Sequence, residues 1–123
     1  MSAIQLREVS KRFGAVQAVR ELSMSVPVGG LCGFIGPNGA GKSTAIRMMM
    51  AILPPDSGEV RVLGGGPTAA RARVGYLPES RGVYPRMRVG AYLAYIARLK
   101  GASPEGLGRK VEGWLARLEL RDV

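Results

Sequence analysis

The sequence contains no histidine and a single cysteine, and both shortages narrow the chemistry open to it. Without histidine the chain lacks the commonest general base and the commonest ligand of transition metals. A lone cysteine, Cys32, cannot form an internal disulfide, which is typical of a chain kept in a reducing compartment. Because Cys32 lies within the apolar run LCGFI, we expect it to be a small buried core residue rather than a reactive thiol.

Acidic and aromatic residues are also scarce. Nine Asp and Glu stand against 18 Lys and Arg, and the resulting net charge of +9 favours anionic partners such as nucleotides, nucleic acids or lipid headgroups. With only two Phe, four Tyr and one Trp, the aromatic residues interleaved with basic ones are too few to predict a nucleic-acid surface. We therefore expect no nucleic-acid partner.

Long apolar runs are missing as well. The longest, MMMAIL at 48–53 and AYLAYIA at 91–97, fall far short of the roughly 20 residues that cross a bilayer. The first residues, MSAIQLREVSKR, carry charges where a signal peptide has its apolar stretch. These features predict a cytoplasmic protein that folds in water.

Five segments carry strand patterns. Residues 4–9 and 18–26 alternate apolar and polar side chains, as a half-buried strand does. The nearly continuous apolar run at 31–35 predicts a strand covered on both faces. Two shorter strands are expected at 59–64 and 73–78.

Three segments carry helix patterns. A helix is expected over 41–53, stopped by Pro54 and Pro55. A second is expected over 89–100, where apolar residues follow helical spacing and Gly101 ends the pattern. A last helix is expected to begin with Ser103 as N-cap and Pro104 at the first helical position. Its apolar face would consist of Leu107, Val111, Trp114, Leu115 and Leu118.

The order of these elements indicates an α/β domain that continues beyond the sequence given. Strands come first and helices later, and no run of strands returns after Leu77. A parallel sheet fed by crossover helices would need more strands to complete its layer. A chain of 123 residues accommodates one domain or part of one.

The stretch GPNGAGKST at 36–44 has the spacing of a P-loop, with an apolar run before it and a helix pattern after it. Its glycines allow a tight turn in which successive amides face phosphate oxygens, assisted by the positive end of the following helix. Lys42 would place a point charge on the terminal phosphates, and the hydroxyl of Ser43 would hold Mg²⁺. The Thr44 hydroxyl would reach the inner phosphates. These residues predict a nucleoside triphosphate site.

GPNGAGKST resembles the form that this loop takes in ATP-binding cassette proteins, and the resemblance extends along the whole chain. It implies an incomplete P-loop NTPase core with an N-terminal antiparallel β subdomain and the start of a helical subdomain. Residues 1–88 would form the nucleotide-binding core and residues 89–123 the beginning of the helical part. The implied cofactors are ATP and Mg²⁺. The implied loop residues for binding the nucleotide are Gly36, Pro37, Asn38, Gly39, Ala40, Gly41, Lys42, Ser43 and Thr44.

Two residues before the loop match the part of the family that binds the base. Phe13, which precedes Gly14, matches the family's aromatic residue that stacks on adenine, and Ala18 matches the small residue beneath it. Stacking of a base on a ring contributes about 1–3 kcal/mol where it has been measured for nucleic acids. The resemblance therefore adds Phe13 and Ala18 to the expected nucleotide site.

The stretch VGYLPESRGVYPRM resembles the segment in which the family usually places a glutamine that contacts Mg²⁺ and the attacking water. Glu79 occupies that position, so it is expected to act with Lys42 in catalysis and with Ser43 on the metal. A carboxylate can bind the metal, but it adds a charge and lacks the amide donor. Val83, Tyr84 and Pro85 would either lie near a transmembrane partner or pack as an ordinary loop. The sequence GYLPE most closely resembles the corresponding segment of exporter subunits.

Much of the family's hydrolytic machinery has no counterpart in this sequence. There is no LSGGQ-like signature, no histidine, and neither Asp56 nor Asp122 ends an apolar run as the metal-binding Asp does. We expect this polypeptide to bind ATP weakly without turnover. The resemblance implies a complete protein that pairs with a second nucleotide-binding domain and a membrane permease, at the inner face of the cell membrane. A soluble nucleic-acid ATPase, a small P-loop kinase and a non-catalytic ATP-binding regulator remain as alternatives.

Overall fold

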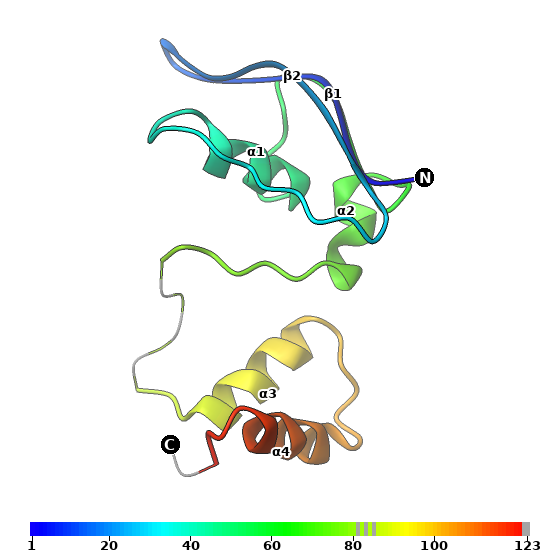
Figure 1. Ribbon diagram of the computed structural model, residues 1–123. Coiled ribbons are helices and arrows are strands. Elements are labelled where there is room, and N and C mark those ends of the chain that lie inside the picture. Colours follow the sequence, from blue (N-terminus) through cyan, green and yellow to red (C-terminus); the bar gives the residue numbers. More distant parts are fainter. Residues whose placement is uncertain (81, 83, 85, 122–123) are drawn as a thin grey trace. The chain divides into compact units, whose positions relative to one another are not determined.

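The computed structural model describes residues 1–80, 82, 84 and 86–121, which form two compact units, Met1–Tyr76 and Leu77–Val123. The first unit contains the sheet and the predicted P-loop, and the second contains a pair of helices (Figure 1). Each unit is described by itself.

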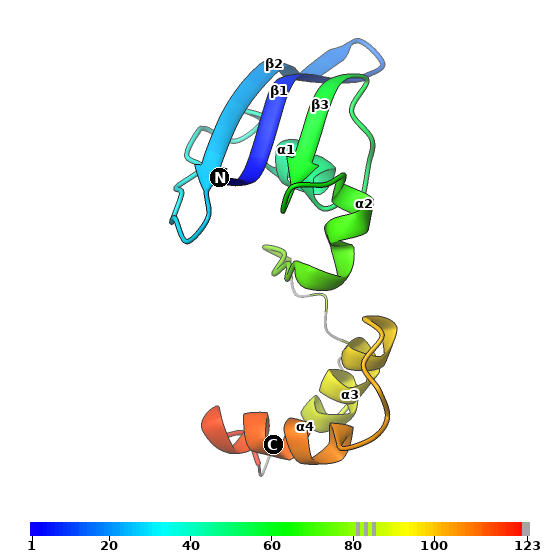
Figure 2. The same cartoon turned by 90° about the vertical axis from the view of Figure 1, so that its right-hand side faces the viewer.

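The first unit is built on a three-stranded antiparallel sheet of β1 (Ser2–Phe13), β2 (Val16–Pro27) and β3 (Ser57–Val62). The strand order is β2-β1-β3, so the long β1 lies in the centre (Figure 2). The predicted strands over 4–9, 18–26 and 59–64 are confirmed in position, although β1 and β2 are longer than predicted. Their alternation buries one face of the sheet.

Two irregularities bend the hairpin of β1 and β2. Glu8 and Glu21 adopt left-handed backbone conformations, with φ of 49° and 46°, where the pairing register shifts. Each of their amides donates to a serine hydroxyl on the other strand: the Glu8 amide to Ser23 and the Glu21 amide to Ser10, both at 2.9 Å. These bonds satisfy amides that a bulge removes from the regular ladder.

Helix α1 (Lys42–Met49) covers the buried face of the sheet (Figure 2). Ala45 and Met48 face the sheet and are almost fully buried. Their spacing of three residues places them on one side of the helix. The core cluster of buried residues consists of Leu6, Val9, Val19, Ala45, Met48, Val60, Val62 and Ala70.

Helix α1 is shorter than the predicted 41–53. Ala51 takes a left-handed conformation with φ of 54°, and the amide of Ile52 donates to the carbonyl of Arg47 at 2.9 Å. A left-handed residue followed by such a wide turn ends a helix. The chain therefore leaves the helix before Pro54 is reached. After β3, a short helix α2 (Pro67–Ala70) and a 3₁₀ turn η1 (Arg71–Arg73) complete the first unit.

The second unit packs α3 (Val89–Leu99) against α4 (Leu107–Arg117). Gly90 permits close contact, because a Cβ there would lie 3.3 Å from Cδ1 of Leu115. Leu107 and Leu115 are buried, whereas Trp114 and Leu118 of the predicted apolar face are half exposed.

No described helix has the length and apolar character needed to cross a membrane.

The predicted N-cap of the last helix is wrong. Gly106, with φ of 69°, is the N-cap, and α4 begins at Leu107 rather than at Pro104. Ser103 accepts a hydrogen bond from the amide of Glu105 at 3.3 Å, which forms a local turn. The left-handed Gly106 interrupts the helical path after this turn, so Pro104 does not start the helix.

Two predicted strands are absent, and Cys32 is not buried. Residues 31–35 and 73–78 pair with no strand in the described part of the chain. Leu31 and Ile35 are almost fully exposed, and Cys32 is an exposed free thiol. A strand needs a neighbour for its amides and carbonyls, and a covered strand needs layers on both faces. The apolar pattern predicts such a strand, but these residues have neither neighbour in the structure.

Asp56 fixes the start of β3 to β1. Its carboxylate accepts from the Lys11 ammonium at 2.6 Å and from the Arg12 amide at 2.7 Å, and its own amide donates to the Ser10 carbonyl at 2.9 Å. The bond from Lys11, followed by the bond from the Arg12 amide, lowers the pKa of Asp56 below its usual value. Both donors favour the charged carboxylate.

Replacing Gly58 by Ala should destabilise the sheet strongly. Gly58 has φ of +84°, and a Cβ there would lie 2.4 Å from the Glu8 carbonyl oxygen. We expect Gly58→Ala to lose about 2–4 kcal/mol, measured by urea denaturation, because backbone strain adds to a contact with main chain. The control is Gly64→Ala, where φ is +82° but the surrounding space is open. It should lose about 1 kcal/mol. Equal losses in the two variants would contradict the close packing at Gly58.

The contribution of the Asp56 carboxylate should depend on pH. Because the folded-state pKa is lowered, the carboxylate stabilises the fold fully at neutral pH, and this contribution disappears as the pH falls through the folded-state pKa. We expect wild type to be more stable than Asp56→Asn at pH 7, with the difference shrinking below about pH 4. Thermal unfolding of both proteins from pH 7 to pH 2.5 would measure it. A difference that stays constant over this range would contradict the prediction.

Candidate functional site

The predicted P-loop runs over residues 36–41 and leads directly into α1, as the cyan loop in Figure 1 shows. Gly39 and Gly41 have φ of 82° and 87°, conformations that favour glycine. The amide of Ala40 closes a turn on the carbonyl of Pro37 at 3.2 Å. Of the three predicted loop glycines, Gly39 and Gly41 are therefore the positions at which the backbone is left-handed, whereas Gly36 is not.

Gly41 lies directly against β2. A Cβ at this position would lie 2.1 Å from the Ala18 carbonyl oxygen and 3.1 Å from Cγ2 of Val19. No side chain can occupy that space. The contact places Ala18, which was predicted to take part in the nucleotide site, beside the loop that was predicted to hold the phosphates.

The Lys42 side chain folds back over its own loop. Its ammonium donates to the carbonyl oxygens of Gly36 and Pro37, the second at 2.7 Å. Lys42 is the first residue of α1, so its charge lies at the end of the helix where the helix dipole is positive. The Lys42 ammonium and the first amides of α1 thus lie close together at the N-terminal end of this helix.

The first turn of α1 suits an anion. It contains no acidic residue, and no side chain caps its amides. The first amides of a helix have no partner within the helix, so they are available to an acceptor. The Ser43 hydroxyl is exposed and Thr44 is half-buried in this same turn, whereas Pro37, Asn38 and Ala40 form the exposed tip of the loop.

Phe13 lies at the end of β1, where it pairs with Val16 across the hairpin turn. Half of its surface is exposed, and the Lys11 ammonium lies 5.8 Å from the centre of its ring. Lys11, two residues earlier, pairs with Val19, the residue that contacts Gly41. Two residues of strand span about 7 Å, so the ring lies a short way along the strand from the contact with the loop.

Glu79 belongs to the second unit and is exposed. The two units are not placed relative to each other, so its predicted action beside Lys42 and Ser43 stays a prediction. Among the described residues, no three Asp, Glu, Cys or His side chains come together as a metal site would require. Tyr84 packs edge-on against Tyr92 and Tyr95 of α3, at 6.5 and 6.2 Å between ring centres, while Val83 and Pro85 lie outside the described residues.

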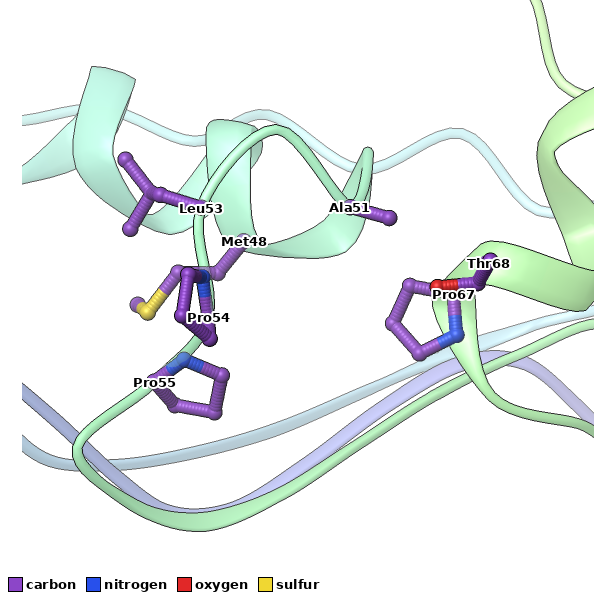
Figure 3. A pocket seen from close by; sticks show the side chains of 7 residues that line it. All are labelled: Met48, Ala51, Leu53, Pro54, Pro55, Pro67 and Thr68. Carbon is purple, nitrogen blue, oxygen red and sulfur yellow. The ribbon is translucent and has the colours of Figure 1, made fainter.

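An open hollow of about 250 Å³, which the sequence does not predict, lies between the end of α1 and the start of α2 (Figure 3). It is lined by Met48, Ala51, Leu53, Pro54, Pro55, Pro67 and Thr68. Thr68 provides the one side-chain hydroxyl in this wall, and no charged residue lines it. The hollow therefore does not suit phosphate. It adjoins the C-terminal end of α1, whereas the P-loop precedes the N-terminal end of this helix.

Two of the relatives found by comparison with known proteins are named as ATP-binding proteins, one for export and one for import. The chain is 40% identical over 125 residues to the Nod factor export ATP-binding protein I of Bradyrhizobium diazoefficiens, covering 97% of this chain and 41% of that protein. It is 33% identical over 119 residues to the Fe(3+) ions import ATP-binding protein FbpC of Pseudomonas fluorescens, covering 91% of this chain and 33% of that protein. The chain thus spans about two-fifths or less of the length of these relatives.

A solved structure supports the same assignment of fold. The chain superimposes with a TM-score of 0.68 and 28% identity on a putative ABC transporter ATP-binding protein from Pyrococcus furiosus, over 80% of this chain and 48% of that one. This likeness confirms the predicted α/β class with an antiparallel N-terminal sheet.

The family comparison covers the P-loop and all of the chain after it. The model described as "ABC transporter" matches residues 19–123, so Phe13 and Ala18 precede the matched region. Together with the left-handed glycines, the lysine at the start of α1 and the shared fold, this match shows that the chain belongs to the ABC transporter family.

Proposed function

We propose that this chain is the ATP-binding part of an ABC transporter and that residues 36–44 hold the phosphates of Mg-ATP. The observation that carries the proposal is the geometry around Gly41, where a left-handed backbone, unpaired helical amides and the Lys42 ammonium converge. On binding, the ammonium would exchange the carbonyl oxygens of Gly36 and Pro37 for phosphate oxygens. The amides of Gly39 and Gly41 would donate hydrogen bonds to the remaining phosphate oxygens.

Adenine is proposed to stack on the ring of Phe13. The ring is half exposed at the end of the hairpin, and Ala18, whose carbonyl lies against Gly41, leaves space beneath a base because its side chain is small. A flat base gains more from a ring face than from an aliphatic side chain. These two residues would give the site its preference for a nucleotide over inorganic phosphates.

Mg²⁺ is proposed to enter with the nucleotide. The exposed hydroxyl of Ser43 fits a hard cation that prefers oxygen ligands, and the Glu79 carboxylate is proposed as a second ligand. Asp56 does not provide this ligand, because its two oxygens already bind Lys11 and Arg12. Bound Mg²⁺ supplies neutralisation of charge on the phosphates. We expect nucleotide binding by this polypeptide without sustained hydrolysis.

In the complete protein, ATP binding and hydrolysis would drive substrate movement by a permease, with a second nucleotide-binding domain completing each site. The chain would then act in the cytoplasm, attached to the inner face of the membrane through that permease. We propose export as the direction, because the relative named for export is 40% identical and the one named for import is 33% identical.

Removing the Lys42 ammonium should weaken nucleotide binding. We expect Lys42→Ala to reduce the affinity for Mg-ATP by about ten- to a hundredfold, because a hydrogen bond to a charged group contributes about 1.5–3 kcal/mol. Isothermal titration calorimetry of the 123-residue chain would measure it. The matched control is Lys110→Ala, an exposed lysine of α4, which should bind as wild type does. Failure of wild type to bind, or a steady ATPase rate that Lys42→Ala abolishes, would contradict the proposal.

Removing the Phe13 ring should affect ATP but not its phosphates alone. We expect Phe13→Ala to weaken Mg-ATP binding by about five- to a hundredfold, as loss of one stacked base does, and to leave binding of Mg-tripolyphosphate unchanged. Phe13→Trp, which keeps a ring face, should retain the wild-type affinity. Parallel titrations with both ligands would separate base from phosphate contacts. Equal loss for both ligands would argue against stacking at Phe13.

A further inference from the structure

At the end of β1, Asp56 forms an ion pair with Lys11, and Lys11 in turn lies near the Phe13 ring. The Lys11 ammonium lies 2.6 Å from the Asp56 carboxylate and 5.8 Å from the centre of the ring. Only 12% of the Lys11 side chain is exposed, against 47% for Asp56. The stem of Lys11 is therefore largely covered, and its ammonium binds the Asp56 carboxylate at the surface.

Backbone groups of β1 hold Asp56, and Asp56 holds Lys11. The Asp56 carboxylate is fixed by the Arg12 amide at 2.7 Å, and the Asp56 amide donates to the Ser10 carbonyl. Lys11 and Phe13 are two residues apart in β1, and the 5.8 Å between the ammonium and the ring centre places their side chains near each other. The flexible stem of Lys11 would otherwise sample many rotamers, and the carboxylate restricts it to the one that lies near the ring.

We propose that Asp56, acting through Lys11, positions the Phe13 ring for the base of the bound nucleotide. This inference rests on the proposed function, since it concerns the same nucleotide site. A cation within about 6 Å of an aromatic ring is attracted to it, which restricts the motion of a ring that is otherwise half exposed at the hairpin end. A ring that is already ordered loses less entropy when a base stacks on it. Asp56 and Lys11 are thus positioning residues, whereas Phe13 contacts the base.

The test compares two isosteric changes in the full 123-residue chain. We expect Asp56→Asn and Lys11→Met each to weaken Mg-ATP binding by about two- to fivefold, which is the strength of an exposed cation–ring contact. Binding of Mg-tripolyphosphate should be unchanged in both, because the ligand has no base. Lys11→Arg keeps a cation near the ring and should restore wild-type affinity for Mg-ATP.

Two further proteins separate positioning from general weakening of the sheet. Glu59→Gln removes the ion pairs that Glu59 makes with Arg7 and Arg61, away from the ring, and should leave both affinities unchanged. In a Phe13→Ala background, Asp56→Asn should have no further effect on Mg-ATP, because the ring that it positions is gone.

Three results would overturn the inference. Asp56→Asn and Lys11→Met could bind Mg-ATP as wild type does, they could lose affinity for tripolyphosphate to the same degree, or Asp56→Asn could lose as much in the Phe13→Ala background as in wild type. Failure of wild type itself to bind either ligand would instead overturn the proposed nucleotide site. Circular dichroism of each variant would establish that it is folded, and Lys11→Arg keeps the test valid if Asp56→Asn is not.

Discussion

The contact between Gly41 and the Ala18 carbonyl is the constraint on which the site depends. It joins the P-loop to β2 at a place where no Cβ fits, and it fixes the start of α1 against the sheet. The same glycine is left-handed, so one residue serves both the turn and the close packing. Ala45 and Met48 then bury against the sheet from this fixed starting point. The predicted P-loop is therefore anchored by the core rather than by its own bonds alone.

The hairpin of β1 and β2 serves as the frame for both ends of the proposed ligand. Val19 contacts Gly41 and pairs with Lys11, and Lys11 lies near the Phe13 ring. The loop for the phosphates and the ring for the base are thus placed by neighbouring residues of one antiparallel pair. Asp56 extends this frame to β3, where its lowered pKa reflects the donors that hold it. Under the proposal, changes at the start of β3 would therefore affect the ring without contacting the proposed nucleotide.

The segments whose predictions failed share one physical feature. Residues 31–35 and 73–78 have the apolar composition of covered strands, yet no described strand lies beside them, and Leu31 and Ile35 remain exposed. A strand forms only when a neighbouring strand pairs with its amides and carbonyls. An apolar sequence pattern permits this pairing but does not supply the neighbour. The relatives are more than twice as long as this chain, and the fold of the family is shared over the part that is present.

The sequence alone determined the P-loop, the three strands of the antiparallel sheet, the position of α3 and the family, because local spacing and alternation encode turns and amphipathic faces. It did not reveal that Gly106 starts α4, that Cys32 is exposed, or that Asp56 binds Lys11 across 45 residues. Those features depend on which segments meet and on where the backbone turns left-handed. Only the tertiary structure decided them, because contacts between distant residues leave no period in the sequence.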